Sequence, residues 1–339
     1  MIISLECDAM LVLAKAVMAI MLGFVTTVIF GYFVVKWLRK EKLGQNVSKT
    51  LGKRHESKQG TPTMGGIMFI IPIVVITVLL ILTGKMQFSP NLFIVLFVFI
   101  AYALLGYIDD YLVVKKHNNK GLSIFVKLLI QLVIALVFFY IYLSSGNEPV
   151  LNIHTLGIEI HMGWLYGLFL LFVLVGSSNA VNITDGLDGL AGGLSAIAFF
   201  AFGIICWGST WTSGYQDLAI FCFVTVGALV GFLVYNAHPA KVFMGDTGSL
   251  ALGAVLGSVA IITNHEITLG VVAGVFIIET LSVIIQLIAI KKFHRKVFLM
   301  APIHHHFEKL GWTENDIVRL FWSVGLILSM AAIGFGVWL

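Results

Sequence analysis

The sequence has 339 residues, of which 59% are hydrophobic and only 11% are charged, and its mean hydropathy is +1.00. These polar side chains are too few to cover the surface of a soluble globular protein. The composition therefore indicates a protein that crosses a membrane several times. The net charge of +4 reflects basic loops that would lie against anionic lipid headgroups, and it gives no reason to expect nucleic-acid binding.

Apolar runs of nearly the ~20 residues needed to cross a bilayer recur along the chain. They predict ten transmembrane helices, at residues 10–35, 63–83, 90–108, 124–143, 162–181, 190–207, 218–237, 248–262, 267–290 and 317–339. The first residues include Glu6 and Asp8 in place of a basic segment, so we expect the first run to be a permanent span and not a signal peptide. Without an internal repeat, the expected fold is one all-α polytopic membrane domain over residues 1–339.

Lys and Arg are concentrated in the loops after the first, third and ninth predicted helices, whereas residues 144–163, 208–217 and 263–266 contain none. By the positive-inside rule, the odd-numbered loops are cytoplasmic and both termini are extracytoplasmic. Residues 150–161, on the external side, alternate apolar and polar residues and predict a small β-hairpin. The three cysteines are dispersed, which favours neither disulfides nor a thiolate metal site.

The segment from Asn179 to Gly193 places acids and amides between long apolar runs. Asp185 and Asp188 are each followed by glycine, so the backbone can approach a ligand while the carboxylates project toward it. Oxygen ligands of this kind suit Mg²⁺, which takes one or two carboxylates and completes its shell with waters and phosphates. A simple turn, with Asn and Asp capping the next helix, would use the same residues.

Further acids lie in other loops on the predicted cytoplasmic side. Asp109 and Asp110 end the third predicted helix, where ionisable groups are costly and are candidates for function. Asp246 lies between glycines at a helix start that favours phosphate, close to Phe243, which could stack on a base or simply pack in the membrane. An acidic cluster surrounded by Lys and His at one membrane face predicts a Mg²⁺–polyphosphate site.

Other polar positions have less specific patterns. Lys58 and Thr63 flank a turn at a helix start. The turn is either an anion-binding site or an ordinary N-cap beside basic residues at the membrane surface. The consecutive histidines at 304–306 diverge by about 100° each on a helix, so they cannot converge on one small ion. Glu279 and Gln286 fall inside the ninth predicted helix and must face the bundle interior, where Glu279 is either an interhelical partner or a catalytic group.

Five segments in order resemble the phospho-N-acetylmuramoyl-pentapeptide-transferase family of the polyprenyl-phosphate N-acetylhexosamine-1-phosphate transferase superfamily. They are Gly60-Thr-Pro-Thr-Met-Gly-Gly66, Asp109-Asp110-Tyr111, Asn179-Ala-Val-Asn-Ile-Thr-Asp-Gly-Leu-Asp-Gly189, Phe243-Met-Gly-Asp-Thr-Gly-Ser249 and Pro302-Ile-His-His-His-Phe307. The resemblance covers essentially the whole chain. It implies Mg²⁺-dependent transfer of phospho-MurNAc-pentapeptide from UDP-MurNAc-pentapeptide to undecaprenyl phosphate, giving lipid I and UMP at the cytoplasmic face of the bacterial plasma membrane in peptidoglycan biosynthesis.

The resemblance also implies roles for individual residues. The expected metal and catalytic centre is formed by Asp109, Asp110, Asp185 and Asp246, with Asp246 as the direct Mg²⁺ ligand. His305 and His306 are expected beside the diphosphate and sugar. The expected substrate-binding residues are Lys58, Thr63, Lys127, Asn179, Asn182, Asp188, Phe243, Gln286 and His304. Family members are commonly homodimers, and other cell-wall synthesis enzymes are further expected partners.

Two other functions share some of these features. Transferases of the same superfamily that use UDP-GlcNAc would share the acidic motifs, although the segment Pro302-Ile-His-His-His favours the muramoyl branch. An ion-coupled transporter would also bury acids, but near the membrane midplane in broken helices, whereas these acids cluster at one face.

Overall fold

The computed structural model describes residues 2–41, 58, 60–115, 121–208 and 215–335. For residues 2–12 and 155 it describes the backbone alone. The helices are α1 (Ile2–Lys40), α2 (Ile67–Leu82), α3 (Pro90–Lys115), α4 (Ile124–Ser144), α5 (Leu165–Thr184), α6 (Leu190–Gly208), α7 (Tyr215–Asn236), α8 (Gly245–Ile262), α9 (Glu266–Val272), α10 (Gly274–Phe293), α11 (Ile303–Lys309) and α12 (Glu314–Ile333). The strands are β1 (Val150–Ile153) and β2 (Ile158–His161), joined by a 3₁₀ turn at His154–Leu156.

Nine helices in the described ranges are long and apolar enough to cross a membrane: α1 over Leu13–Lys40, then α3, α4, α5, α6, α7, α8, α10 and α12. This confirms a multi-pass membrane protein. The tenth predicted span is present as α2, which is shorter because its helix begins at Ile67 and not near Thr63. The residues before Ile67 are drawn into pairing with another loop, since the N–H groups of Gly65 and Gly66 donate to the carbonyls of Phe243 and Met244.

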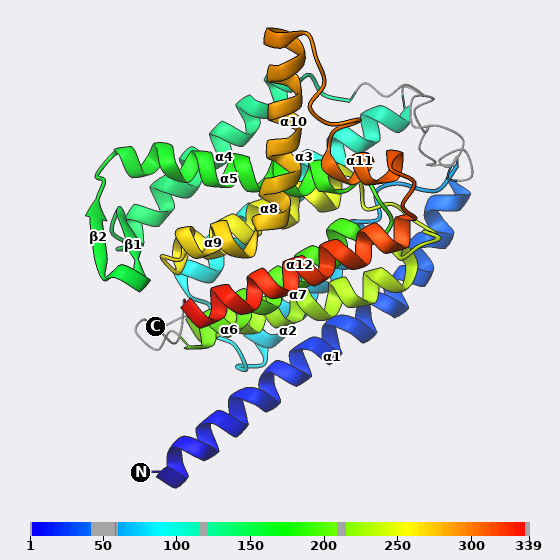
Figure 1. The fold of residues 1–339 in the computed structure, drawn as a ribbon. Helices are drawn as coiled ribbons and strands as arrows, with labels where there is room; N and C mark the ends of the chain where they lie inside the picture. The colour runs from blue at the N-terminus through cyan, green and yellow to red at the C-terminus, as the bar shows by residue number, and fades with distance from the viewer. Residues whose placement is uncertain (1, 42–57, 59, 116–120, 209–214, 336–339) are drawn as a thin grey trace.

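The prediction of one continuous helix over residues 267–290 is wrong. The segment is divided at Ala273 into α9 and α10, and α10 stands across the direction of the other long helices (Figure 1). Gly270 and Gly274 lie on either side of the break. Glycine is a poor helix former and a common site of sharp bends, so the chain can change direction there at little cost.

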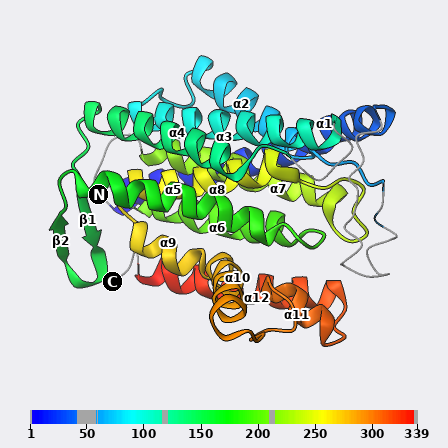
Figure 2. The ribbon, with the colours of Figure 1, turned by 90° about the horizontal axis from the view of Figure 1, so that it is seen from above.

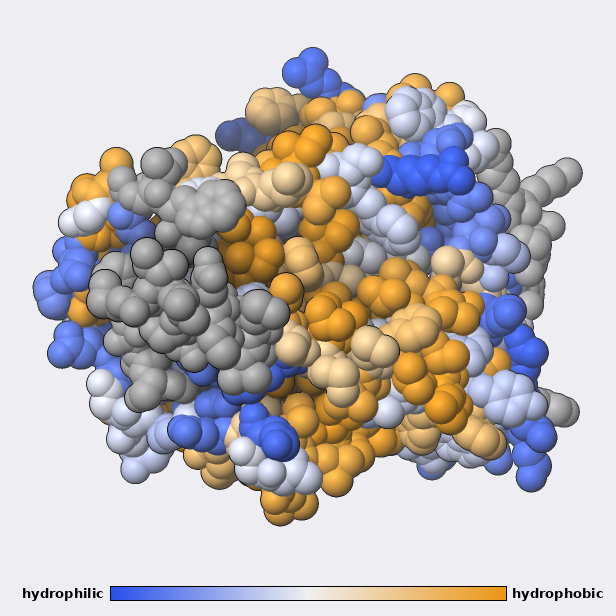
Figure 3. Space-filling model, turned by 90° about the horizontal axis from the view of Figure 1, so that it is seen from below, coloured by the Kyte–Doolittle hydropathy of each residue, from blue (hydrophilic) through white to orange (hydrophobic). Residues whose placement is uncertain are grey.

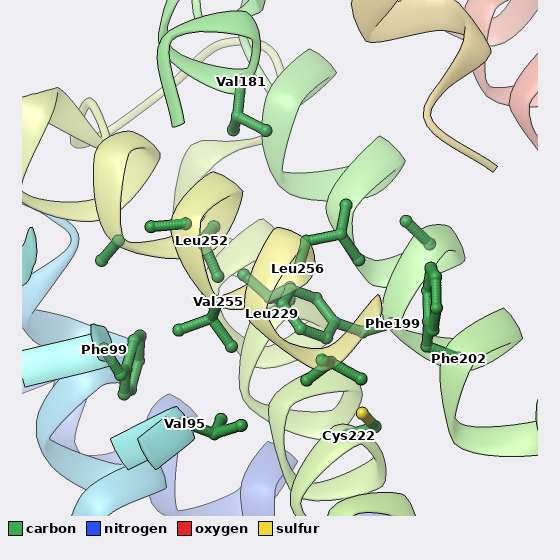
Figure 4. Packing of buried hydrophobic residues seen from close by; sticks show 14 of the residues in the cluster. Val95, Phe99, Val181, Phe199, Phe202, Cys222, Leu229, Leu252, Val255 and Leu256 are labelled. Atoms are coloured by element: carbon green, nitrogen blue, oxygen red, sulfur yellow. The ribbon is translucent and has the colours of Figure 1, made fainter. Parts of the chain in front are cut away.

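Helix α8 forms the centre of the bundle and packs against α3, α5 and α6 (Figure 2). Its apolar side chains Leu252, Val255 and Leu256 are buried among residues of the neighbouring helices, including Phe99 and Phe199 (Figure 4). In a membrane the hydrophobic effect does not drive apolar helices together, so their association depends on close packing of their backbones. The small residues of α8 permit this close packing.

One such contact joins α8 to α5. A Cβ built on Gly253 would lie 2.2 Å from the carbonyl oxygen of Ser177, so only glycine allows the two helices to approach so closely. Large apolar side chains are instead displayed on the outside, for example Phe125 on α4 and Leu287 on α10. One face of the molecule accordingly shows a broad apolar area with hydrophilic residues toward its edges (Figure 3).

The predicted hairpin is confirmed. Strands β1 and β2 are antiparallel, with Val150 opposite His161 and Ile153 opposite Ile158. The ring of His154 stacks on His265 with centroids 4.3 Å apart, which docks the hairpin on the turn between α8 and α9. The start of α1 and the end of α12 lie toward the hairpin end of the bundle (Figure 1), as the predicted topology requires, while the side of the membrane they face stays a prediction.

A buried acid lies beside this docking turn, at the start of α9. Glu266 is 5% exposed and accepts a hydrogen bond from the Tyr166 hydroxyl, while its Oε2 has no partner among the described residues. Burial raises the pKa of this carboxyl to about 7, although the bond from Tyr166 acts in the opposite direction. The fold therefore favours the neutral acid.

We expect the stability of the protein to fall with rising pH through this group. A carboxyl whose pKa is raised by folding stabilises the fold fully below its unfolded pKa of 4.5 and loses that contribution as pH rises through about 7. Glu266→Gln, which cannot ionise, should thus gain stability relative to the natural protein between pH 5 and 8, by at most roughly 3 kcal/mol. Thermal unfolding in detergent at several pH values measures the difference, and a pH-independent difference would contradict it.

Candidate active site

The predicted site residues gather at the end of the bundle away from the hairpin, where α3 and α5 end and α8 begins. Two loops that are distant in sequence meet there: the N–H of Phe243 donates to the Pro62 carbonyl over 2.8 Å, and the N–H of Gly65 donates to the Phe243 carbonyl over 2.8 Å. The pairing brings the loop of Thr63 beside the loop of Phe243. Thr63 is buried, and its Oγ1 lies where a Cβ on Gly245 would approach within 2.9 Å.

Asp110 holds the start of α8. Its carboxylate accepts hydrogen bonds from the N–H of Asp246 (3.1 Å), the N–H of Thr247 (2.9 Å) and the Thr247 hydroxyl (2.6 Å). A carboxylate that takes the free N–H groups of a first helical turn caps the helix and interacts favourably with its dipole. In this arrangement Asp110 positions Asp246, and its role as a metal ligand stays a prediction.

Asp109 and Asp246 share a single lysine. The Lys127 Nζ lies 2.8 Å from Asp109 Oδ2 and 2.7 Å from Asp246 Oδ2. The other oxygen of Asp246 accepts from Asn182 Nδ2 at 2.8 Å, and the other oxygen of Asp109 accepts from the N–H of Leu122 at 2.6 Å. Four helices, α3, α4, α5 and α8, thus converge on one acidic centre.

Asp185 follows the last residue of α5 and is the third acid of this centre. Burial raises its pKa well above the ordinary value, and the nearby charges of Asp246 and Asp110 raise it further, while a bond from the Gly245 backbone opposes them. Within the described part of the chain, Lys127 is the one basic residue that pairs with these acids, so their carboxylates repel one another when ionised and a bound cation would relieve that repulsion. Oxygen donors arranged in this way fit a hard divalent cation, and Mg²⁺ in particular.

A second cluster surrounds Lys58. Its Nζ lies 2.7 Å from Asp188 Oδ1 and 2.6 Å from Glu314 Oε1, and His238 Nδ1 lies 3.0 Å from Asp188 Oδ2. The ligand atoms of Asp188, His238 and Glu314 all lie within 4.8 Å of one another, which is close enough to hold a metal. However, the ammonium group contacts both carboxylates, so Lys58 itself supplies the positive charge that a metal would supply.

The surroundings of Lys58 favour its protonated, positively charged form. Burial by itself would lower the pKa of Lys58, but Glu314 and Asp188 together raise it above the ordinary value. We therefore favour the centre at Asp246 over the Lys58 cluster as the metal site.

Glu314 and His238 were missed by the sequence interpretation. Glu314 lies in the first turn of α12 after the N-cap Thr313, where an acid needs no explanation beyond the helix dipole. Its contact with Lys58 spans 256 positions in the chain, and no local pattern encodes such a pair. His238 lies in the loop between α7 and α8, and the only signal for it was its closeness to Phe243 and Asp246.

The three consecutive histidines point to different partners, which confirms that they do not converge on one ion. His304 Nδ1 lies 3.0 Å from Glu279 Oε2, and His305 Nδ1 lies 2.6 Å from Glu308 Oε2. His306 Nδ1 accepts from the backbone of Leu299 at 3.1 Å.

Two predicted substrate-binding side chains are engaged within the protein. Gln286 Oε1 accepts from the N–H groups of Val297 and Phe298, and its Nε2 donates to the Phe298 carbonyl. Asn179 donates to Gln131 Oε1 and to the carbonyl of Val175. In this structure both amides hold the protein together, and their substrate roles stay predictions.

Comparison with known proteins identifies the family. A model described as Glycosyl transferase family 4 matches residues 92–264, and one described as Phospho-N-acetylmuramoyl-pentapeptide-transferase signature 1 matches residues 58–70. A phospho-N-acetylmuramoyl-pentapeptide-transferase of Geobacillus sp. (strain WCH70) is 50% identical over 324 residues, which cover 95% of this chain and 98% of the relative. The enzyme of that name from Bacillus subtilis (strain 168) is 46% identical over 321 residues, covering 94% of this chain and 97% of the relative.

The chain belongs to the phospho-N-acetylmuramoyl-pentapeptide-transferase family. This multi-pass membrane protein is therefore an enzyme, a transferase. The signature at residues 58–70 covers the loop that carries Lys58 and Thr63 and that pairs with the Phe243 loop.

The approach of α3 to the start of α8 should tolerate no side chain at position 106. A Cβ on Gly106 would lie 2.1 Å from the carbonyl oxygen of Asp246, so Gly106→Ala must push the two helices apart. We expect a loss of about 1–3 kcal/mol of stability, as is typical of overpacking, together with reduced transferase activity. Gly176→Ala in α5 is the matched control, because its Cβ would meet nothing within 4 Å. Equal thermal unfolding midpoints for the two variants would show that the contact at Gly106 is not needed.

Proposed function

We propose that the protein transfers phospho-MurNAc-pentapeptide from UDP-MurNAc-pentapeptide to undecaprenyl phosphate, which yields lipid I and UMP in peptidoglycan synthesis. Family membership supports this proposal, and one geometric observation carries it to the residues: Lys127 bridges Asp109 and Asp246 at the end of the bundle, next to Asp185. A diphosphate needs neutralisation and alignment more than covalent help from the protein. Lys127 can neutralise part of the diphosphate charge, and the acids around it can bind a cation that neutralises and aligns the rest.

The proposed metal ligands are Asp246 and Asp185, with Asp109 beside them and Asp110 supporting Asp246 through the first turn of α8. Mg²⁺, when bound, would offset the charge of the diphosphate and polarise the phosphoryl group. Asn182 keeps Asp246 oriented from the other side.

In the proposed reaction, an oxygen of the lipid phosphate attacks the phosphorus that carries the sugar. A new P–O bond forms, the bridging P–O bond to the uridine-bearing phosphate breaks, and UMP leaves with the electrons of that bond. Lys127 is placed to exchange one of its carboxylate partners for an oxygen of the diphosphate. Asp109 is held at both oxygens, by Lys127 and by the N–H of Leu122, which suits it to orient the incoming phosphate or take its proton.

Direct transfer is favoured over a covalent aspartyl phosphate. A phosphate monoester has a second pKa of ~6, so at neutral pH it is already a competent nucleophile. A carboxylate relay of the kind that some transferases use is chemically possible, but it is not needed to generate the nucleophile.

The second cluster is proposed to bind the nucleoside end of the donor. Phe243 is partly buried in the loop that pairs with residues 60–66, and the same loop reaches the Lys58 cluster, because the N–H of Ala240 donates to Asp188 Oδ2 over 3.0 Å. An aromatic ring next to a charged and hydrogen-bonding cluster is suited to a base and its ribose.

The remaining parts of the proposal follow from the distribution of charge and from the family. The proposed location of the site is the cytoplasmic face of the bacterial plasma membrane, and the distribution of the basic loops in the sequence supports it. The proposed partners are the two substrates, membrane lipid, a second copy in a homodimer, and other enzymes of cell-wall synthesis.

Release of UMP tests the reaction directly. With radiolabelled UDP-MurNAc-pentapeptide and Mg²⁺ as the only divalent ion, we expect UMP release only when undecaprenyl phosphate is added. Asp246→Asn should lower the rate at least about 100-fold, because an electrostatic contact made to the transferring group is lost. Glu159→Gln, an exposed acid of the hairpin, is the matched control and should keep the full rate.

Three results would overturn parts of the proposal. A stoichiometric burst of UMP without lipid phosphate would replace direct transfer by a covalent route. Faster turnover of UDP-GlcNAc would place the protein in the other branch of the superfamily. Near-normal activity of Asp246→Asn would remove Asp246 from the metal centre.

The nucleoside assignment predicts a difference between the two substrates. Lys58→Ala and Phe243→Ala should each weaken a stacking or charge-assisted contact worth about 1–3 kcal/mol, and so raise KM for the UDP donor roughly 5- to 150-fold. KM for undecaprenyl phosphate should change much less. Lys85→Ala, outside the site, serves as the control. Equal increases in both KM values would mean that Lys58 and Phe243 maintain the fold instead.

A further inference from the structure

Helix α10 carries a polar face that the proposed reaction has not yet used. Glu279, Ser282 and Gln286 are spaced three and four residues apart, so they lie on one side of the helix, and all three are buried. Their neighbours Ile278 and Leu281 are exposed. Within a membrane helix, a buried polar face of this kind must contact other protein elements.

The three residues of this face make different contacts. Gln286 binds the backbone of residues 297–298, and the Ser282 hydroxyl donates to the carbonyl of its own helix at Glu279. The carboxylate of Glu279 instead reaches α11, where its Oε2 lies 3.0 Å from His304 Nδ1. The side chains of this pair are 0% and 1% exposed, so the contact is fully shielded from solvent.

The other nitrogen of His304 is the decisive observation. His304 Nε2 is buried and has no hydrogen-bond partner among the described residues. Such orphaned groups are uncommon, because a buried polar atom without a partner costs about 1–3 kcal/mol.

This nitrogen faces the loop between the two clusters of the candidate site. A Cβ on Gly186 would lie only 2.3 Å from His304 Nε2, so the ring sits directly against the backbone of Gly186. Gly186 follows Asp185 of the acidic centre and precedes Asp188 of the Lys58 cluster. The orphaned nitrogen therefore lies against the short segment that joins Asp185 of the acidic centre to Asp188 of the Lys58 cluster.

We propose that Glu279 is a positioning residue that holds His304 so that Nε2 donates to a phosphate oxygen of the nucleotide-sugar donor. This inference rests on the proposed function for the identity of the donor. In this arrangement the imidazole contacts Glu279 through Nδ1 and the diphosphate through Nε2, and the carboxylate of Glu279 fixes the orientation of the ring. Carboxylates that fix a functional histidine through its second nitrogen act in the same way at metal sites.

A double-mutant cycle tests whether Glu279 acts through His304. Glu279→Gln keeps an oxygen opposite Nδ1 but removes the charge, and we expect kcat to fall about 10- to 100-fold, the range typical of groups that orient a histidine at a metal site. KM for undecaprenyl phosphate should stay unchanged. His304→Gln should lower kcat at least as much, and adding Glu279→Gln to it should cause no further loss.

Ser282→Ala is the matched control, because it removes a buried polar group from the same face of α10 without touching the histidine. It should keep the kcat of the natural protein. Independent, multiplying losses in the double variant, or an equal loss in Ser282→Ala, would overturn the positioning role and leave a structural one.

A measurement without turnover separates this inference from the proposed function. In protein with ¹⁵N-labelled histidine, the His304 ring signals, assigned by their absence in His304→Gln, should shift when UDP-MurNAc-pentapeptide binds in the absence of lipid phosphate. The shift should be lost in Glu279→Gln. If lipid-dependent UMP release by the natural protein is normal while saturating donor leaves the His304 signals unchanged, the inference fails and the proposed function stands. If the natural protein releases no UMP, the proposed function fails.

Discussion

The hydrogen bonds from the start of α8 to Asp110 are the contact on which the rest of the site depends. Helix α8 is the central helix of the bundle, and its first turn has free N–H groups that a membrane protein must satisfy internally. Asp110 takes the N–H groups of Asp246 and Thr247, and Gly106, one turn earlier in α3, lets the two helices touch. The backbone of Asp246 is therefore fixed before any substrate arrives, and Lys127 and Asn182 hold its carboxylate.

The two clusters have the same arrangement of charge. Each places one lysine between two carboxylates from different helices or loops. Lys127 lies between Asp109 and Asp246, and Lys58 lies between Asp188 and Glu314. The clusters differ in the other groups that surround the lysine and its two carboxylates. Around Lys127 a further acid, Asp185, adds a third carboxyl group, whereas in the Lys58 cluster Asp188 and Glu314 also accept hydrogen bonds from the backbone N–H groups of Ala240 and Asp188. That difference suits one cluster to a cation and the other to neutral and polar parts of a substrate.

The sequence predicts those parts of the fold that depend on local patterns. Apolar runs and their lengths located the membrane helices, and alternation located the hairpin at residues 150–161. The break at Ala273 was missed because the apolar run continues through it, and the late start of α2 was missed because it depends on pairing with residues 243–244. The acidic motif residues were found because Asp and Glu are rare in this chain, at 17 of its 339 residues. Glu314 was not, because its partner Lys58 lies at the other end of the chain and a helix start explains an acid equally well.

The pairing of the two loops also sets a length. Phe243 and Asp246 belong to one short stretch of backbone, anchored at Phe243 by Pro62 and Gly65 and at Asp246 by Asp110. Three residues span at most about 11 Å, and neither end can move without breaking backbone hydrogen bonds. If a base lies against Phe243 and a phosphate near Asp246, the stretch acts as a ruler between them. A donor whose base and reacting phosphorus are separated by another phosphate, or by one fewer, would meet only one end of the ruler at a time.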